Sequence, residues 1–168
     1  MLLYILLIVR GYHYIPNANN IIIREQIKYN GILTKYQIPC HSQAARIKTF
    51  SSAIQSSSRK QIIDIFSIYD LIAFRYIFYN LDDLYKFYHH VKLNFLIYYE
   101  KDYIINPKSN NYKALHIRYK NTYKNSSIKQ LECQLFIIND YYDSLYGKSQ
   151  YISKNYYNLY VNNNEIIW

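Results

Sequence analysis

The stretch from Lys113 to Ile137, which reads KALHIRYKNTYKNSSIKQLECQLFI, decides the fold of this chain. Polar and apolar side chains alternate over Lys113–Lys120 and again over Leu131–Ile137, and a period of two is typical of β-strands. The segment Tyr123–Ser127 between them is rich in turn-forming residues. The stretch therefore predicts a hairpin whose strands each carry one apolar and one polar face.

The segments around this hairpin predict helices and further strands. In chain order we first expect a helix over Ile21–Tyr29 ending at Asn30–Gly31, a strand over Ile32–Ile38, a helix over Gln43–Gln55 and a mobile loop at Ser56–Ser58. A strand over Tyr69–Tyr79 and a helix from an Asp82 cap to Lys92 follow. After them come a polar loop over Lys101–Asn111, the hairpin, and a helix from an Asp140 cap to Lys154. This order predicts an α+β fold with a mixed, mostly antiparallel sheet flanked by helices.

Length and composition limit the class of protein. The chain has 168 residues and a formal net charge of +9, and its 23 tyrosines suggest AT-rich codons, so the charge alone identifies no nucleic-acid partner. Two cysteines, Cys40 and Cys133, exclude a disulfide scaffold and a four-cysteine zinc site, and they fit a reducing, cytoplasmic setting. The apolar run Leu2–Val9 is shorter than the roughly 20 residues that span a bilayer. We expect it to dock on the domain, with no membrane partner.

Two carboxylates are the most informative polar residues. Asp70 begins one expected strand and Glu132 begins another, and carboxylates at neighbouring strand ends can hold one Mg²⁺. A magnesium site ringed by cations suits a substrate with several phosphates. The cations expected around this one are Arg46, Lys48, Arg75, Lys101 and Lys108. Taken singly, each of these residues also has an ordinary structural explanation, such as a turn cap or a solvated surface charge.

The run KDYIINPKSNNYKALH at 101–116 closely resembles the central signature of the RelA/SpoT alarmone synthetases. Upstream, YDLIAFR at 69–75 resembles the family's strand with the magnesium aspartate, and RIK at 46–48 resembles its Arg-x-Lys. Downstream, ECQL at 132–135 resembles its Glu-Val-Gln-Ile strand. The resemblance covers about residues 31–152 and implies a nucleotidyltransferase-like fold. It also implies GTP pyrophosphokinase activity, in which a pyrophosphate moves from ATP to the 3′-hydroxyl of GDP or GTP.

Carried over by position, the resemblance assigns a role to each candidate residue. Asp70 and Glu132 would be catalytic and hold Mg²⁺. The ATP phosphates would bind Arg46, Lys48 and Arg75, and the guanosine nucleotide would bind Lys101, Lys108, Asn110, Tyr112, His116 and Gln134. Tyr112 would stack on guanine, as aromatic side chains do at nucleotide sites. The implied synthetase domain covers 31–155, after an N-terminal segment 1–30 with the short helix and before a C-terminal tail 156–168.

Several positions depart from the family pattern. On the ATP side, Ala45 replaces the family's glycine, Thr49 its histidine and Ser56 its lysine. Arg59 or Lys60 could substitute for the lost lysine. Each charged hydrogen bond lost costs on the order of 1.5–3 kcal/mol, so these changes predict weaker ATP binding.

The remaining departures are milder or lie on the acceptor side. Asn111 replaces the glycine before Tyr112, a mild change because Asn tolerates positive φ. Lys113 replaces a glutamine and Phe136 an arginine. Two other readings stay open: a catalytically inactive guanosine-nucleotide-binding remnant of a longer bifunctional enzyme, and a relative that pyrophosphorylates the 3′ end of tRNA. A tRNA or ribosome partner and a homo-oligomer are also left open.

Overall fold

A computed structural model describes residues 15–153 of the chain, with side chains from Ile15 to Leu145. Its helices are α2 (Ala18–Lys35), α3 (Phe50–Lys60), α4 (Leu81–Asn94) and α5 (Ile138–Ser153), with a 3₁₀ turn at Ile65–Ser67. Its strands are β1 (Ser42–Ile47), β2 (Ile72–Phe78), β3 (Ile97–Asp102), β4 (Leu115–Lys120) and β5 (Gln130–Ile137). The run Leu2–Val9 and the expected tail 156–168 lie outside the described residues.

The five strands form one sheet in the order β1-β2-β5-β4-β3. Only β2 and β5 run parallel, and the other neighbours are antiparallel. The predicted hairpin is present as β4 and β5, with Ile117 opposite Cys133 and Leu115 opposite Leu135. The predicted α+β fold with a mixed, mostly antiparallel sheet is therefore confirmed.

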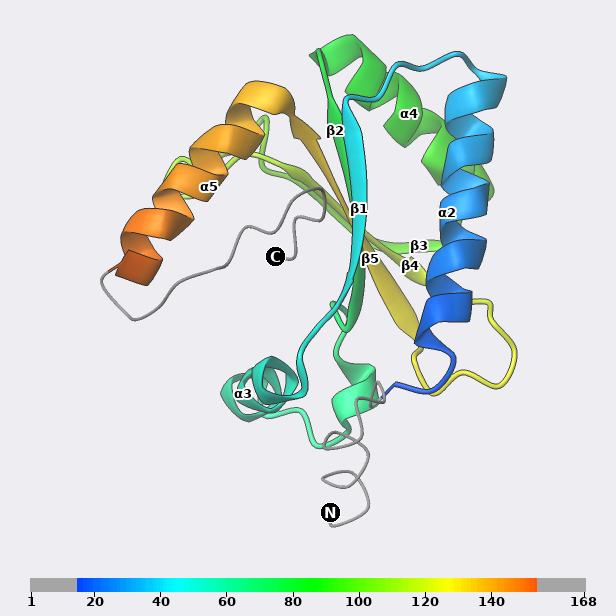
Figure 1. The fold of residues 1–168 in the computed structure, drawn as a ribbon, viewed down its shortest axis with the longest axis vertical. Helices are drawn as coiled ribbons and strands as arrows, with labels where there is room; N and C mark the ends of the chain where they lie inside the picture. Colours follow the sequence, from blue (N-terminus) through cyan, green and yellow to red (C-terminus); the bar gives the residue numbers. More distant parts are fainter. Residues whose placement is uncertain (1–14, 154–168) are drawn as a thin grey trace.

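The two faces of the sheet differ in chemistry. Helices α2 and α4 lie side by side over one face, whereas α5 lies on the opposite side (Figure 1). The face beneath α2 and α4 is apolar: Phe74, Cys133 and Ile117 meet Tyr29 and Phe87 in the main core. Burial of this face provides the main driving force for folding. The opposite face carries polar side chains, and α5 covers one end of it through a small cluster that includes Phe136 and Tyr141.

Helix α2 is longer than predicted. It continues through Asn30–Gly31 to Lys35, so the strand predicted over Ile32–Ile38 is wrong. A mid-helix glycine costs about 1 kcal/mol, but the next residue, Ile32, is buried in the core and outweighs that cost. The expected boundary between the N-terminal segment 1–30 and the domain 31–155 thus falls inside this helix.

The segment Gln43–Gln55 is not one helix. It forms the edge strand β1, whose Ala44 and Ala45 are helix formers by propensity, and then the start of α3. Thr49 caps α3 by accepting a hydrogen bond from the Ser52 N–H. The expected loop Ser56–Ser58 lies inside this helix, where Ser56 is buried.

Two predicted caps and one predicted loop are also corrected. Helix α4 begins after Asn80, not Asp82, because the Asn80 side chain accepts from the Asp83 N–H. Helix α5 begins at Ile138, directly after β5, so Asp140 lies in its first turn. The sequence did not predict strand β3, which takes in the first two residues of the expected loop Lys101–Asn111.

No helix within residues 15–153 has the length and apolarity to cross a membrane.

Candidate active site

The strand register brings the candidate residues into two rows across the polar face of the sheet, named here the site face. One row runs Arg46, Ala73, Glu132, Arg118, Tyr99, and the next runs Ala44, Arg75, Gln134, His116, Lys101. Residues paired across neighbouring strands project to the same side of a sheet. Segments far apart in the sequence therefore contribute to one surface.

Asp70 lies in the turn just before β2 and is surrounded by cations. Its Oδ2 accepts a 2.5 Å hydrogen bond from Lys48 Nζ and lies 3.7 Å from Arg46 Nη2, while its Oδ1 lies 3.8 Å from Lys60 Nζ. Burial alone would raise the pKa of Asp70, but the hydrogen bond and charge of Lys48, with the charges of Lys60 and Arg46, outweigh burial and lower it. Asp70 is therefore a charged carboxylate at neutral pH.

Glu132 lies beside it on β5 and is almost completely buried, at 3% exposure. Its Oε1 accepts a 2.7 Å hydrogen bond from Gln134 Nε2 and is 3.8 Å from His116 Nδ1, and its Oε2 is 3.6 Å from Arg118 Nε. Burial, followed by the nearby charge of Asp70, raises the pKa of Glu132 against the opposing effects of Gln134 and Arg118. The two carboxylates thus have opposite pKa shifts, which is typical of acid–base sites.

A polar pocket opens next to Asp70, between β1 and α3. It measures about 410 Å³ and is lined by Arg46, Lys48, Ser52, Gln55, Ser56 and Arg59. Three of these side chains are cationic, and the others offer hydroxyl and amide groups. Such a lining suits a polyphosphate. Ser56 takes the place of the family's lysine, but Arg59 and Lys60 bring positive charge to this region from the same helix.

The loop after β3 brings a second basic and aromatic group to the site face. Lys108 Nζ lies 4.4 Å from the ring centroid of Tyr103 and 4.5 Å from that of Tyr112. The Tyr112 hydroxyl and His116 Nε2 are 2.8 Å apart. Asn111 has a φ of 58°, so it adopts the left-handed conformation that its glycine-like position requires. This group lies on the opposite side of Glu132 from the polar pocket, because β4 and β3 follow β5 in the sheet.

Arg75 is placed differently from the other predicted ATP ligands. It is 2% exposed, and its Nη1 donates a 3.1 Å hydrogen bond to the Tyr141 hydroxyl of α5. Its guanidinium also lies 5.2 Å from the Phe136 ring centroid. Arg75 thus lies in the row next to Arg46, against α5, and is not part of the pocket lining. Asn110 is exposed, and its side chain accepts a hydrogen bond from the Tyr112 N–H within its own loop.

Two cations beside the carboxylates were not among the predicted site residues. Lys60 pairs with Asp70, and Arg118 pairs with Glu132. Arg118 shares the polar side of its strand with His116, so the alternation of that strand already pointed to it. The sequence pointed to Lys60 only as a substitute for the lysine that Ser56 replaces, because the approach of Lys60 to Asp70 depends on how α3 packs.

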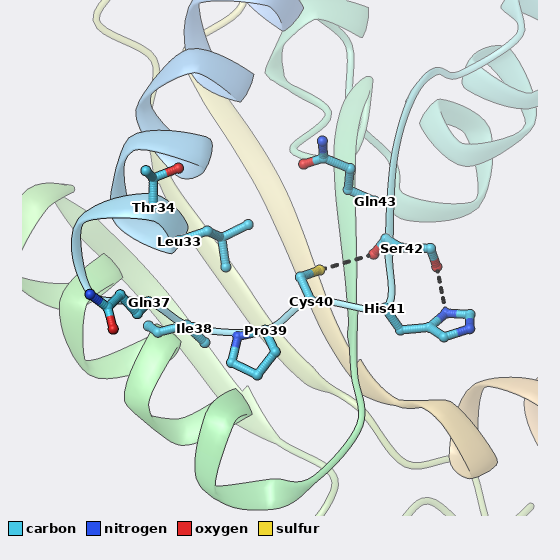
Figure 2. Close-up of a pocket in the computed structure, with 9 residues that line it drawn as sticks. All are labelled: Leu33, Thr34, Gln37, Ile38, Pro39, Cys40, His41, Ser42 and Gln43. Carbon is cyan, nitrogen blue, oxygen red and sulfur yellow. Dashed lines mark hydrogen bonds between the residues drawn. The ribbon is translucent and has the colours of Figure 1, made fainter.

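A separate pocket of about 660 Å³ lies between the end of α2 and the start of β1, and none of the predicted site residues lines it (Figure 2). Cys40 and His41 border this pocket. The Cys40 thiol donates to the carbonyls of Ser42 and Ile77, whereas His41 Nδ1 contacts the Ser42 hydroxyl. Burial raises the pKa of the Cys40 thiol. The two side chains therefore do not form a nucleophile and base pair, as expected for neighbours in an extended segment.

Solved structures share this fold. The small alarmone synthetase 1 from Bacillus subtilis, bound to its product pppGpp, has a TM-score of 0.72 at 19% identity, over 84% of this chain and 80% of that chain. The same synthetase bound to AMPCPP has a TM-score of 0.63 at 17% identity, over 84% of this chain and 78% of that chain. The small alarmone synthetase 2 from Bacillus subtilis has a TM-score of 0.71 at 25% identity, over 84% of this chain and 80% of that chain. The predicted α+β fold, with a mixed, mostly antiparallel sheet flanked by helices, is the fold of these synthetases.

Sequence comparison identifies the family. A search of curated proteins finds no matching sequence. Residues 45–158, however, match the family model described as "Region found in RelA / SpoT proteins". The match runs from Ala45, within β1, through α5 and includes both carboxylates and the basic residues around them. Because it spans more than half of the chain, the chain belongs to the RelA/SpoT family.

Proposed function

We propose that this chain is an ATP:GDP/GTP 3′-pyrophosphotransferase that makes guanosine tetra- or pentaphosphate with the help of Mg²⁺. The observation that carries the proposal is the position of the Asp70 and Glu132 carboxylates between two cationic groups. A polyphosphate pocket lies on one side of the carboxylates, and a basic, aromatic loop lies on the other. Membership of the RelA/SpoT family supports the same reaction, as do the similar synthetases bound to pppGpp and to AMPCPP.

The donor side is the pocket around Arg46 and Lys48. A triphosphate carries several negative charges, and phosphoryl-transfer enzymes act mainly by positioning and neutralising such charge. Lys48 would exchange its bond to Asp70 for one to a phosphate oxygen, with Arg59 lining the same pocket. These cations support activity despite the replacement of the family's lysine by Ser56.

The acceptor side is the loop of Lys108 and Tyr112. A guanine base would stack on the Tyr112 ring, while Lys101, Lys108, Asn110 and His116 would bind the phosphates and ribose. Base stacking on an aromatic ring contributes about 1–3 kcal/mol. The bond from the Tyr112 hydroxyl to His116 fixes the ring on this face before the nucleotide arrives.

Glu132 would act as the base. It would take the proton of the acceptor 3′-hydroxyl, and that oxygen would then form a bond to the β-phosphorus of ATP. The bond from this phosphorus to the oxygen that bridges to the α-phosphorus breaks, and AMP leaves. Gln134 holds Oε1 of Glu132, and Oε2 would accept the proton.

The residues fit the magnesium ion that this reaction uses. Asp70 Oδ1 is a buried oxygen with no hydrogen bond among the described residues, and Glu132 lies close enough for the charge of Asp70 to raise its pKa. These two carboxylates would hold the ion, which supplies neutralisation of phosphate charge. One or two carboxylates suffice for Mg²⁺, because this ion keeps waters and takes phosphate oxygens as its other ligands.

Thin-layer chromatography of the purified chain with labelled ATP, Mg²⁺ and either GDP, GTP or tRNA tests the proposal. We expect a new guanosine polyphosphate with GDP or GTP that is absent with Asp70→Asn. Label on tRNA instead would identify a tRNA-modifying relative. A folded chain that binds GDP but transfers nothing would be an inactive binding protein. Either result would overturn the proposal.

A further inference from the structure

One arrangement on the site face is not used by the mechanism above. The Arg118 guanidinium packs against two aromatic rings, with its Cζ 3.3 Å from the Tyr69 centroid and 4.1 Å from the Tyr99 centroid. Lys60 Nζ also lies 3.9 Å from the Tyr69 centroid. We call these four residues the Arg118 stack. They come from α3, the turn before β2, β4 and β3, so the stack joins four separate segments.

The stack contacts both carboxylates. Arg118 faces Glu132 directly across the β4–β5 register, with Nε 3.6 Å from Oε2. Tyr69 precedes Asp70 in the chain, and Lys60 lies 3.8 Å from the Asp70 carboxylate. Gln134 holds Oε1 of Glu132 by a hydrogen bond, and Arg118 lies on the side of Oε2. The charge of Arg118 therefore acts on the orientation of Oε2.

We propose that Arg118 is a positioning residue: packed against the rings of Tyr69 and Tyr99, it fixes the orientation of the Glu132 carboxylate at the site. The inference rests on the proposed function. Both ring centroids lie within 4.1 Å of the Arg118 Cζ, so the position of the guanidinium is set before any substrate binds. A planar guanidinium stacks in this way and a lysine ammonium does not. The geometry therefore requires arginine, and positive charge alone does not suffice.

Steady-state kinetics of pyrophosphate transfer test this inference. Arg118→Lys keeps the positive charge but replaces the planar guanidinium by an ammonium group. We expect kcat to fall about tenfold to a hundredfold. The KM values for ATP and GDP should stay within about twofold, because uniform substrate binding is unchanged. Lys120→Gln is the matched control: it removes an exposed cation at the end of the same strand and should leave kcat unchanged.

A second pair of variants tests the stack if Arg118→Lys fails to fold. Tyr99→Leu removes the ring and should lower kcat more than Tyr99→Phe, which keeps it. Because the residues act as one unit, the double variant Arg118→Lys/Tyr99→Leu should lose little more than the larger single loss. Thermal unfolding of each variant, measured alongside, separates lost positioning from lost folding.

The outcomes separate the two claims. An active wild-type chain whose Arg118→Lys variant keeps full kcat overturns the inference alone. So does a variant whose KM rises while its kcat holds, because Arg118 would then contact the substrate. Full additivity of the Arg118 and Tyr99 losses also overturns it. A wild-type chain with no transfer overturns the proposed function, and the inference with it.

Discussion

The pairing of Lys48 with Asp70 makes a prediction about stability that does not depend on catalysis. The two side chains are 11% and 14% exposed, and one short charged hydrogen bond joins them. Lys48→Met removes this bond and leaves the carboxylate partly buried. A charged hydrogen bond contributes about 1.5–3 kcal/mol. Arg46 and Lys60 remain within 3.8 Å of Asp70, so we expect a net loss of about 1–2 kcal/mol in the free energy of unfolding.

The loss should depend on pH in a defined direction. Lys48, with Lys60 and Arg46, lowers the pKa of Asp70 below its ordinary value of 3.8 despite burial. A carboxyl whose folded-state pKa is depressed stabilises the protein above its unfolded-state pKa, and that contribution is lost as the pH falls through the folded-state value. The difference between wild type and Lys48→Met should therefore be full near pH 7 and shrink toward about pH 3.

Urea unfolding followed by far-UV circular dichroism at several pH values measures this difference. At neutral pH the melting temperature of Lys48→Met should also fall by roughly 2–8 °C. Lys120→Met, an exposed lysine on β4, serves as the control and should cost less than about 0.5 kcal/mol. A loss for Lys48→Met that is absent at neutral pH, or equally large near pH 3, would refute the reasoning.

Three further predictions concern the site itself. Glu132→Gln should abolish synthesis yet spare nucleotide binding measured by calorimetry, and undiminished synthesis would contradict its role as base. Tyr112→Leu should weaken GDP binding about tenfold or more and leave ATP binding unchanged; an equal loss for both nucleotides would argue against guanine stacking. Because burial and Asp70 raise the pKa of Glu132, its carboxyl in the metal-free chain should titrate above its ordinary value of 4.5 when it is followed by NMR. Gln134→Leu removes a group that lowers this pKa, so the titration should move to higher pH, and an unmoved titration would contradict the role of Gln134.

The sequence predicted the centre of the sheet well and its edges poorly. Strands β4 and β5 alternate cleanly because one side of each packs on the core, as Leu115 and Ile117 do. The edge strand β3 has exposed residues on both sides, including Glu100 and Lys101, and so shows no such period. The other edge strand, β1, is helical by propensity, and its pairing with β2 overrides that preference.

The candidate site followed from motif spacing more fully than from local structure. Motif and strand pattern pointed to Asp70 and Glu132, and the parallel pairing of β2 with β5 explains why they meet. The burial of Arg75 against Tyr141 was not predictable, because it depends on how α5 packs across the sheet. The Arg118 stack likewise needs Tyr69 and Tyr99 to approach from two segments, which no local sequence pattern encodes.

The most direct test of the account follows the label from each end of ATP. The purified chain is incubated with GDP, Mg²⁺ and ATP labelled either at the γ-phosphate or at the α-phosphate. The account predicts that the γ label enters a guanosine polyphosphate and that the α label remains in AMP, with neither product formed by Asp70→Asn. Release of the γ label as inorganic phosphate, or no labelled guanosine product at all from the folded chain, would contradict it.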